Sequence, residues 1–97
     1  ESNEALDKKS MTKSLSLELA PRVRVNGISP GAILWPTEIE EEVHDKGQQK
    51  KNAILDSIPL KRLGDPQDIS NLAYFFAEEG DYITGQVVKV DGGRSLV

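Results

Sequence analysis

The chain has 97 residues, of which 37% are hydrophobic and 29% charged, and its formal net charge is -4 at pH 7. A chain of this length forms at most one small domain, and alone it buries only about 60% of the surface that its unfolded form exposes. The acidic balance disfavours nucleic acid, which attracts basic surfaces. The sequence has no cysteine, which excludes disulfides and cysteine-based metal sites.

The start of the chain and its apolar runs bear on where the protein works. Residues 1–7 are acidic and polar, unlike a signal peptide. No apolar run approaches the about 20 residues that span a bilayer. We therefore expect a cytoplasmic protein without a membrane partner, in agreement with the lack of cysteine. Because the chain does not begin with Met, we expect a processed, truncated or partial protein.

The first predicted element is a helix over residues 7–19. Met11, Leu15 and Leu19 recur every four positions, which is the spacing of one helical stripe. Nearby serines keep part of the helix surface small, which suits close packing. Pro21 ends the helix at or before the preceding residue.

A short strand and a long connector are predicted next. Val23, Val25 and Ile28 alternate with polar residues, which is typical of a strand, and the Pro30-Gly31 pair ends it. Residues 31–61 form an irregular connector with its own short helices, the first of which we expect to end at Gly47.

The sharpest helix start in the chain lies at residues 65–68. Asp65 is typical of an N-cap, Pro66 of the first helical residue, and Asp68 of an acidic third position. A strand over 86–90 follows this helix. A strand–helix–strand connection predicts a parallel strand pair.

Three stretches in this order resemble the C-terminal part of the short-chain dehydrogenase/reductases. The overall match runs from about Thr12 to Val97, and its first stretch runs from Ser14 to Gly31 and ends in Val23-Arg24-Val25-Asn26-Gly27-Ile28-Ser29-Pro30-Gly31. The second, residues 58–69, reads Ile58-Pro59-Leu60-Lys61-Arg62-Leu63-Gly64-Asp65-Pro66-Gln67-Asp68-Ile69. The third comprises Tyr82-Ile83-Thr84-Gly85-Gln86 and Val90-Asp91-Gly92-Gly93.

This resemblance implies an α/β fold, the C-terminal part of a Rossmann-type doubly wound parallel sheet. Residues 1–97 would be one partial reductase domain, with residues 32–58 as a substrate-covering connector. The resemblance also implies an NADP cofactor, a small-molecule substrate and a homo-oligomer, either a tetramer or a dimer.

A narrower similarity concerns the substrate. Residues 30–36 and the ending 92–96 are similar to bacterial pteridine reductases, and Trp35 stands where many family members carry a threonine. This similarity predicts hydride transfer to a pterin-like ring. The alternatives are a 3-oxoacyl or sugar-alcohol reductase of the same family, and a non-catalytic binding or assembly module on a reductase scaffold.

The catalytic signature of the family is absent from this sequence. Its members use a tyrosine followed four residues later by a lysine, but Tyr74 and Tyr82 are followed there by other residues. A glycine-rich phosphate loop after a strand is absent too. We therefore assign no catalytic residue, and expect the parent protein to be an oxidoreductase but this chain alone to be inactive.

The predicted binding residues all follow the first strand. The resemblance implies that Pro30, Gly31, Ala32 and Ile33 bind the nicotinamide end of the cofactor, and that Leu34 and Trp35 contact substrate. The alternative for the first four is an ordinary turn, and for Trp35 an anchor of the connector.

The remaining candidates favour structural roles. Arg62 is expected to form a cap or salt bridge, and the Asp91-Gly92-Gly93 turn is expected to serve assembly. His44 lies among acidic residues and, without cysteines, builds no zinc site, so no metal site is predicted.

Overall fold

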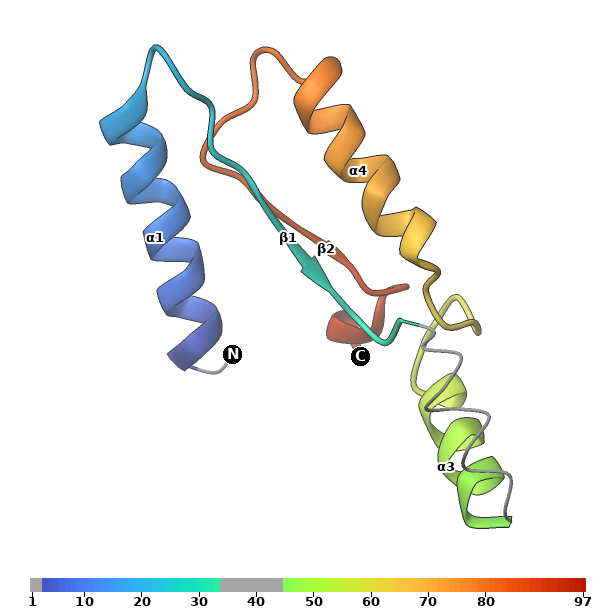
Figure 1. The fold of residues 1–97 in the computed structure, drawn as a ribbon. Coiled ribbons are helices and arrows are strands. Elements are labelled where there is room, and N and C mark those ends of the chain that lie inside the picture. Colours follow the sequence, from blue (N-terminus) through green and yellow to red (C-terminus); the bar gives the residue numbers. More distant parts are fainter. Residues whose placement is uncertain (1–2, 34–44) are drawn as a thin grey trace. The chain divides into compact units, whose positions relative to one another are not determined.

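The computed structural model describes residues 3–33 and 45–97 (Figure 1). The predicted order of helix, strand, helical connector, helix and strand is confirmed; the first helix expected in the connector lies outside the described residues. The elements are α1 (Asn3–Leu19), β1 (Gly27–Pro30), α3 (Asp45–Asp56), α4 (Pro66–Glu78), β2 (Val87–Val90) and a final 3-10 helix (Arg94–Leu96).

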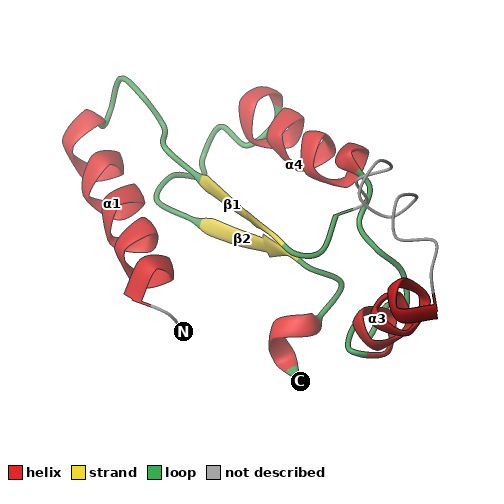
Figure 2. Cartoon of the chain, turned by 60° about the horizontal axis from the view of Figure 1, so that its bottom comes forward, coloured by secondary structure: helices red, strands yellow, loops and turns green. Residues whose placement is uncertain are grey.

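The two strands form a parallel pair, as predicted (Figure 2). The Gly27 N–H donates to the Gln86 carbonyl at 2.8 Å, and the Gly31 N–H donates to the Val90 carbonyl at 2.9 Å. Donors and acceptors thus advance together along the two strands. This is the arrangement that a helical crossover between parallel strands produces, and it confirms an α/β fold.

The chain divides into two compact units. The first comprises Glu1–Ser29 with Ser70–Lys89, and the second comprises Pro30–Ile69 with Val90–Val97. Both strands and α4 contribute residues to each unit. In the first unit, α1 and the later part of α4 flank the strands (Figure 1).

Helix α1 contacts the strand pair through small side chains. Ser16 is only 3% exposed, and a Cβ atom built on Gly85 would lie 2.8 Å from the Ser16 Oγ. Met11, in contrast, is 62% exposed, and Leu15 is 39% exposed. The apolar stripe that predicted the helix is therefore not the face that packs on the strands. The glycine backbone leaves room for a hydroxyl but not for a leucine or methionine side chain.

Strand β1 begins later than predicted. The Val25 N–H donates to the Thr84 Oγ1 at 3.1 Å. The Asn26 amide donates to the Ile83 carbonyl at 2.9 Å and accepts from the Gln86 N–H at 3.1 Å. Side-chain bonds thus stand beside a single main-chain bond, from the Gly85 N–H to the Val25 carbonyl at 2.8 Å, before Gly27, where β1 begins.

Arg24 holds the C-terminal end of α4. Its Nη1 donates to the carbonyls of Phe76 at 2.6 Å and Gly80 at 2.8 Å, and its Nη2 donates to the Ala77 carbonyl at 3.3 Å. The last carbonyls of a helix have no partner within the helix, and its negative end attracts a cation. The helix ends at Glu78, just before the predicted terminator Gly80.

The second unit has a small apolar centre. Ile58 is 2% exposed. Among the side chains described, in residues 7–33 and 49–97, it is the one hydrophobic side chain that is fully buried. A Cβ atom on Gly92 would lie 2.7 Å from the Ile58 Cγ2. The expected helix end at Gly47 is wrong, because Gly47 lies inside α3. A glycine inside a helix costs only about 1 kcal/mol, which the rest of α3 outweighs.

Candidate functional site

The predicted cofactor segment, Pro30–Ile33, continues β1 past its last residue, Pro30. Open α/β sheets bind ligands at the carboxyl ends of their strands. All the contacts described below for this segment are made within the second unit, by Gly64 and by Val90 and Asp91 at the end of β2. The structure therefore brings together residues that lie in three separate stretches of the sequence.

Gly31 lies against the end of β2. Its N–H donates to the Val90 carbonyl at 2.9 Å, and a Cβ atom at this position would lie 2.7 Å from both the Cα and the Cβ of Asp91. Real Cβ atoms do not approach backbone so closely, so any other residue here would force the two chains apart. The glycine is required by this close backbone approach, and its predicted role in cofactor binding stays a prediction.

Ala32 and Ile33 pair with Gly64 on the other side. The Gly64 N–H donates to the Ala32 carbonyl at 2.8 Å, and Ile33 forms a parallel bridge with Gly64. A Cβ atom on Gly64 would lie 2.5 Å from the Ile33 Cδ1. The segment is thus fixed on both sides. Sequence reasoning missed Gly64, because no local pattern signals a bridge between residues so far apart.

The turn at residues 91–93 is held by its own aspartate. The Asp91 carboxylate accepts hydrogen bonds from the N–H groups of Gly93 at 2.9 Å and Ser95 at 3.2 Å. Gly92 and Gly93 have φ values of 64° and 92°, which disfavour side chains. The Leu60 N–H donates to the Gly92 carbonyl at 3.1 Å. These bonds show a structural turn, and its role in assembly stays a prediction.

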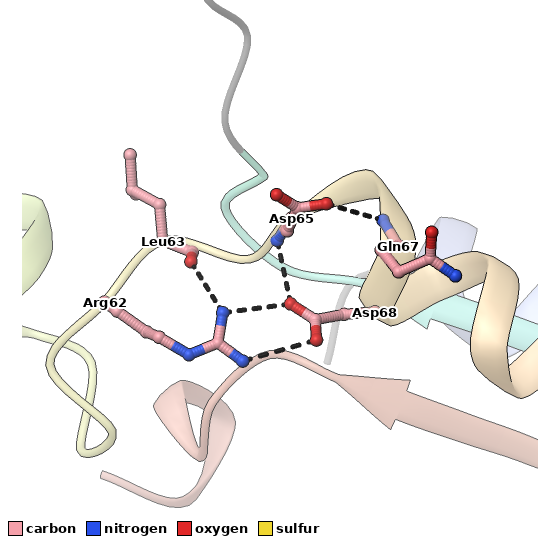
Figure 3. Close-up of polar contacts among 5 residues, drawn as sticks. All are labelled: Arg62, Leu63, Asp65, Gln67 and Asp68. Atoms are coloured by element: carbon pink, nitrogen blue, oxygen red, sulfur yellow. Dashed lines mark hydrogen bonds and ion pairs between the residues drawn. The ribbon is translucent and has the colours of Figure 1, made fainter.

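Arg62 forms a salt bridge with Asp68 (Figure 3), as expected. Its Nη1 donates to Asp68 Oδ2 at 2.9 Å and its Nη2 donates to Oδ1 at 3.3 Å, while Nη1 also donates to the Leu63 carbonyl at 3.1 Å. The hydrogen bond from Arg62, followed by one from the Asp65 N–H, lowers the pKa of Asp68 below its ordinary value. The same pairing raises the pKa of Arg62.

The start of α4 agrees with its predicted capping. Asp65 Oδ1 accepts from the Gln67 N–H at 2.8 Å, and Asp68 Oδ2 accepts from the Asp65 N–H at 2.8 Å. This reciprocal pair is the arrangement of a capping box, with aspartate in place of the usual glutamate. Pro66 is the first residue of α4. The local sequence therefore indicated this site correctly.

Other candidates remain outside the site or outside the described residues. Leu34, Trp35 and His44 fall in the undescribed segment, so their predicted roles are not tested. Tyr74 is 65% exposed and Tyr82 is fully exposed. Within residues 3–33 and 45–97, no group of three or more side chains is suited to hold a metal ion. The same residues contain no helix whose length and apolar character would allow it to cross a membrane.

Comparison with known proteins identifies the family. Residues 7–95 match a family model described as enoyl-(acyl carrier protein) reductase. A short-chain dehydrogenase/reductase from Brucella melitensis, described as a glucose/ribitol dehydrogenase, superimposes with a TM-score of 0.76 and is 37% identical, covering 91% of this chain and 34% of that one. The chain belongs to the short-chain dehydrogenase/reductase family.

Sequence relatives within the family carry more than one name. A 3-oxoacyl-[acyl-carrier-protein] reductase from Rickettsia felis is 39% identical over 90% of this chain and 35% of the relative. A glucose 1-dehydrogenase from Gluconobacter oxydans is 40% identical over 89% of this chain and 32% of the relative. The chain thus spans about a third of the length of these relatives.

Proposed function

We propose that the protein to which these residues belong is an NADP(H)-dependent short-chain reductase, with a 3-oxoacyl thioester or a sugar as its substrate class. The observation that carries the proposal is the Pro30–Ile33 segment, which is fixed at the carboxyl end of β1 by Val90 and Gly64. It occurs in a chain that is 39% identical to a 3-oxoacyl reductase and 40% identical to a glucose 1-dehydrogenase.

The residues present fit one end of the cofactor. The close approach of Gly31 to Asp91 and the bridge of Ile33 to Gly64 give a rigid main-chain wall, which suits a flat, uncharged ring. We propose that the main chain of Gly31, Ala32 and Ile33 binds the nicotinamide end. The cofactor supplies hydride when bound. Preference for the phosphorylated cofactor is supported by a relative described as an NADPH-dependent reductase, which is 36% identical with a TM-score of 0.78.

The substrate assignment follows the named relatives. They support the acyl or sugar alternative that the sequence left open, and neither relative is described as a pteridine reductase. The pterin hypothesis rests on the resemblance of residues 30–36 and 92–96, and its expected substrate contacts, Leu34 and Trp35, lie outside the described residues, so it stays a prediction. The homo-oligomeric state and the cytoplasmic location stay predictions too.

The proton donor is not supplied by these 97 residues. Without a tyrosine and lysine at the required spacing, and without a glycine-rich loop, we propose that the isolated chain turns over no substrate. A non-catalytic assembly module remains the rival function. A glycine-rich strand–helix–strand unit in the coding sequence upstream would count against that rival.

The decisive experiment is an NADPH oxidation assay on the full-length protein with a 3-oxoacyl thioester, a keto sugar and a dihydropterin. We expect turnover with at least one of the first two. Turnover with the dihydropterin alone would overturn the substrate class. A folded protein that neither binds nor oxidises NADPH would overturn the reductase proposal and favour the module.

A variant of Gly31 connects the assay to the site. Gly31→Ala introduces a Cβ atom 2.7 Å from the Asp91 main chain, and misplacing a binding group by 1 Å costs up to about 100-fold in rate. We expect kcat/KM to fall by about that factor. Gly27→Ala is the matched control on the same strand, because its Cβ atom would meet the end of a side chain, Val87 Cγ2 at 3.2 Å, and not main-chain atoms. An equal loss of kcat/KM in both variants would show that the activity does not depend specifically on the Pro30–Ile33 segment.

A further inference from the structure

Gly64 donates its N–H to the Ala32 carbonyl. Each of its two neighbours in the chain, Leu63 and Asp65, forms a hydrogen bond with one member of the Arg62–Asp68 ion pair. On one side, the Leu63 carbonyl accepts from Arg62 Nη1 at 3.1 Å. On the other side, the Asp65 N–H donates to Asp68 Oδ2 at 2.8 Å. Arg62 and Asp68 are themselves joined by two hydrogen bonds (Figure 3). The ion pair therefore closes a small ring of contacts around Gly64.

The chain enters this strip through a strained turn. Lys61 has a φ of 57°, in the left-handed region that residues with side chains seldom occupy. Its N–H donates to the Ile58 carbonyl at 2.9 Å, and its Nζ donates to the Asp56 carbonyl at 2.9 Å. Such a conformation persists only when surrounding contacts impose it. The two bonds from Lys61 to the Ile58 and Asp56 carbonyls are such contacts, and the ion pair begins at the next residue.

Capping of α4 does not account for Arg62. The first turn of the helix is satisfied by Asp65 and Asp68, which accept from the N–H groups of Gln67 and Asp65. Arg62 adds no bond to a helix N–H. It connects Asp68 to the Leu63 carbonyl, so its contacts act on the strip that carries Gly64.

We infer that Arg62 and Asp68 are positioning residues for the cofactor-facing segment. The pair fixes the Leu63–Asp65 strip, Gly64 in turn fixes Ala32 and Ile33, and the nicotinamide end of the cofactor is held by the segment so fixed. This inference rests on the proposed function for the role of the segment. The link from Arg62 to Gly64 stands on the contacts alone, which allows the two to be tested separately.

The first measurement compares the two halves of the cofactor in the full-length protein. For wild type and Arg62→Gln, the inhibition constants of reduced nicotinamide mononucleotide and of adenosine 2′,5′-bisphosphate are determined, together with KM for NADPH and kcat. We expect Arg62→Gln to weaken the binding of the nicotinamide fragment and to raise KM for NADPH by about tenfold. This effect is smaller than the loss of about 100-fold that a misplacement by 1 Å can cause. We expect the adenosine fragment to bind unchanged. Equal weakening of both fragments, or no weakening of either, would overturn the inference.

Two further variants keep the test open if Arg62→Gln does not fold. Arg62→Lys keeps the charge but loses the bidentate geometry, and Asp68→Asn keeps the shape but loses the charge. We expect each to show a smaller change of the same kind. Arg22→Gln is the control, because Arg22 is an exposed arginine between α1 and β1, and it should change neither fragment.

The second measurement does not depend on the cofactor. Amide hydrogen exchange at Gly64 reports the bond to Ala32 directly, and we expect about tenfold faster exchange in Arg62→Gln than in wild type or Arg22→Gln. Unchanged exchange at Gly64 would overturn the link between the ion pair and the segment. If the exchange changes but the wild type binds no NADPH, the proposed function fails while the link holds.

Discussion

The two ends of α4 are both held by an arginine, but in different ways. At the N-terminal end, Arg62 pairs with Asp68, six residues away in the chain. At the C-terminal end, Arg24 donates to the carbonyls of Phe76 and Gly80, 52 and 56 residues away. The first contact is local and joins two side chains. The second is long-range and joins a side chain to the main chain.

This difference decides what each end contributes. Arg62 is 58% exposed, and exposed ion pairs are screened by water and salt. Arg24 is partly buried, and it donates to main-chain carbonyls at the end of the helix, of which the Gly80 carbonyl also accepts from the Ile83 N–H at 3.1 Å. We therefore expect the C-terminal contact to matter more for stability, and the N-terminal contact to matter more for the position of the adjoining strip.

The largest expected effect follows from removing the long-range contact. Arg24→Gln loses up to three charge-assisted hydrogen bonds to Phe76, Ala77 and Gly80, and hydrogen bonds to charged groups contribute about 1.5–3 kcal/mol each. Allowing for compensation by water, we expect the free energy of unfolding to fall by about 3 kcal/mol, measured by urea denaturation of the full-length protein. Arg22→Gln serves as the control, and an equally small loss in both variants would contradict the comparison.

A smaller effect is expected at the N-cap. Asp65→Ala removes the carboxylate that accepts from the Gln67 N–H, and loss of an N-cap costs about 1 kcal/mol. Urea denaturation should show this loss, whereas Asp65→Asn, which keeps the acceptor oxygen, should lose only a few tenths of a kcal/mol. A loss of unfolding free energy in Asp65→Ala as large as that in Arg24→Gln would contradict the expectation that the C-terminal end of α4 contributes more to stability.

The smallest effect on stability is expected at low pH, where Asp68 becomes protonated. Because the bond from Arg62 lowers the pKa of folded Asp68, its stabilisation is complete above the unfolded pKa of about 3.9 and is lost as the pH falls through the folded value. The protection of the Asp65 and Asp68 amides, measured as exchange relative to the intrinsic rate at each pH, should therefore fall below about pH 4. Asp68→Asn should abolish the transition at the N-terminal end; its persistence would assign it to another group.

The same contrast between local and distant contacts explains how much of the site could be predicted. The family resemblance predicts a cofactor segment at Pro30–Ile33, and this role stays a prediction. The structure shows why Gly31 is required there: Asp91 leaves no room for a side chain. Gly64 was missed, because its bridge to Ile33 joins residues from different elements. The strand start at Val23 was placed too early, since the side chains of Thr84 and Asn26 make most of the contacts before Gly27, beside one main-chain bond from Gly85 to Val25.

The sequence by itself determined the features that depend on near neighbours. These are the start of α4 at Asp65 and Pro66, the end of β1 at Pro30-Gly31, the order of the elements and the family. They are accessible because caps, prolines and short apolar runs act within a few residues. Only the tertiary structure decided which faces pack. It buried Ser16 and left Met11 exposed, because the strands meet α1 with glycine backbone, and no property of α1 alone reveals what lies opposite it.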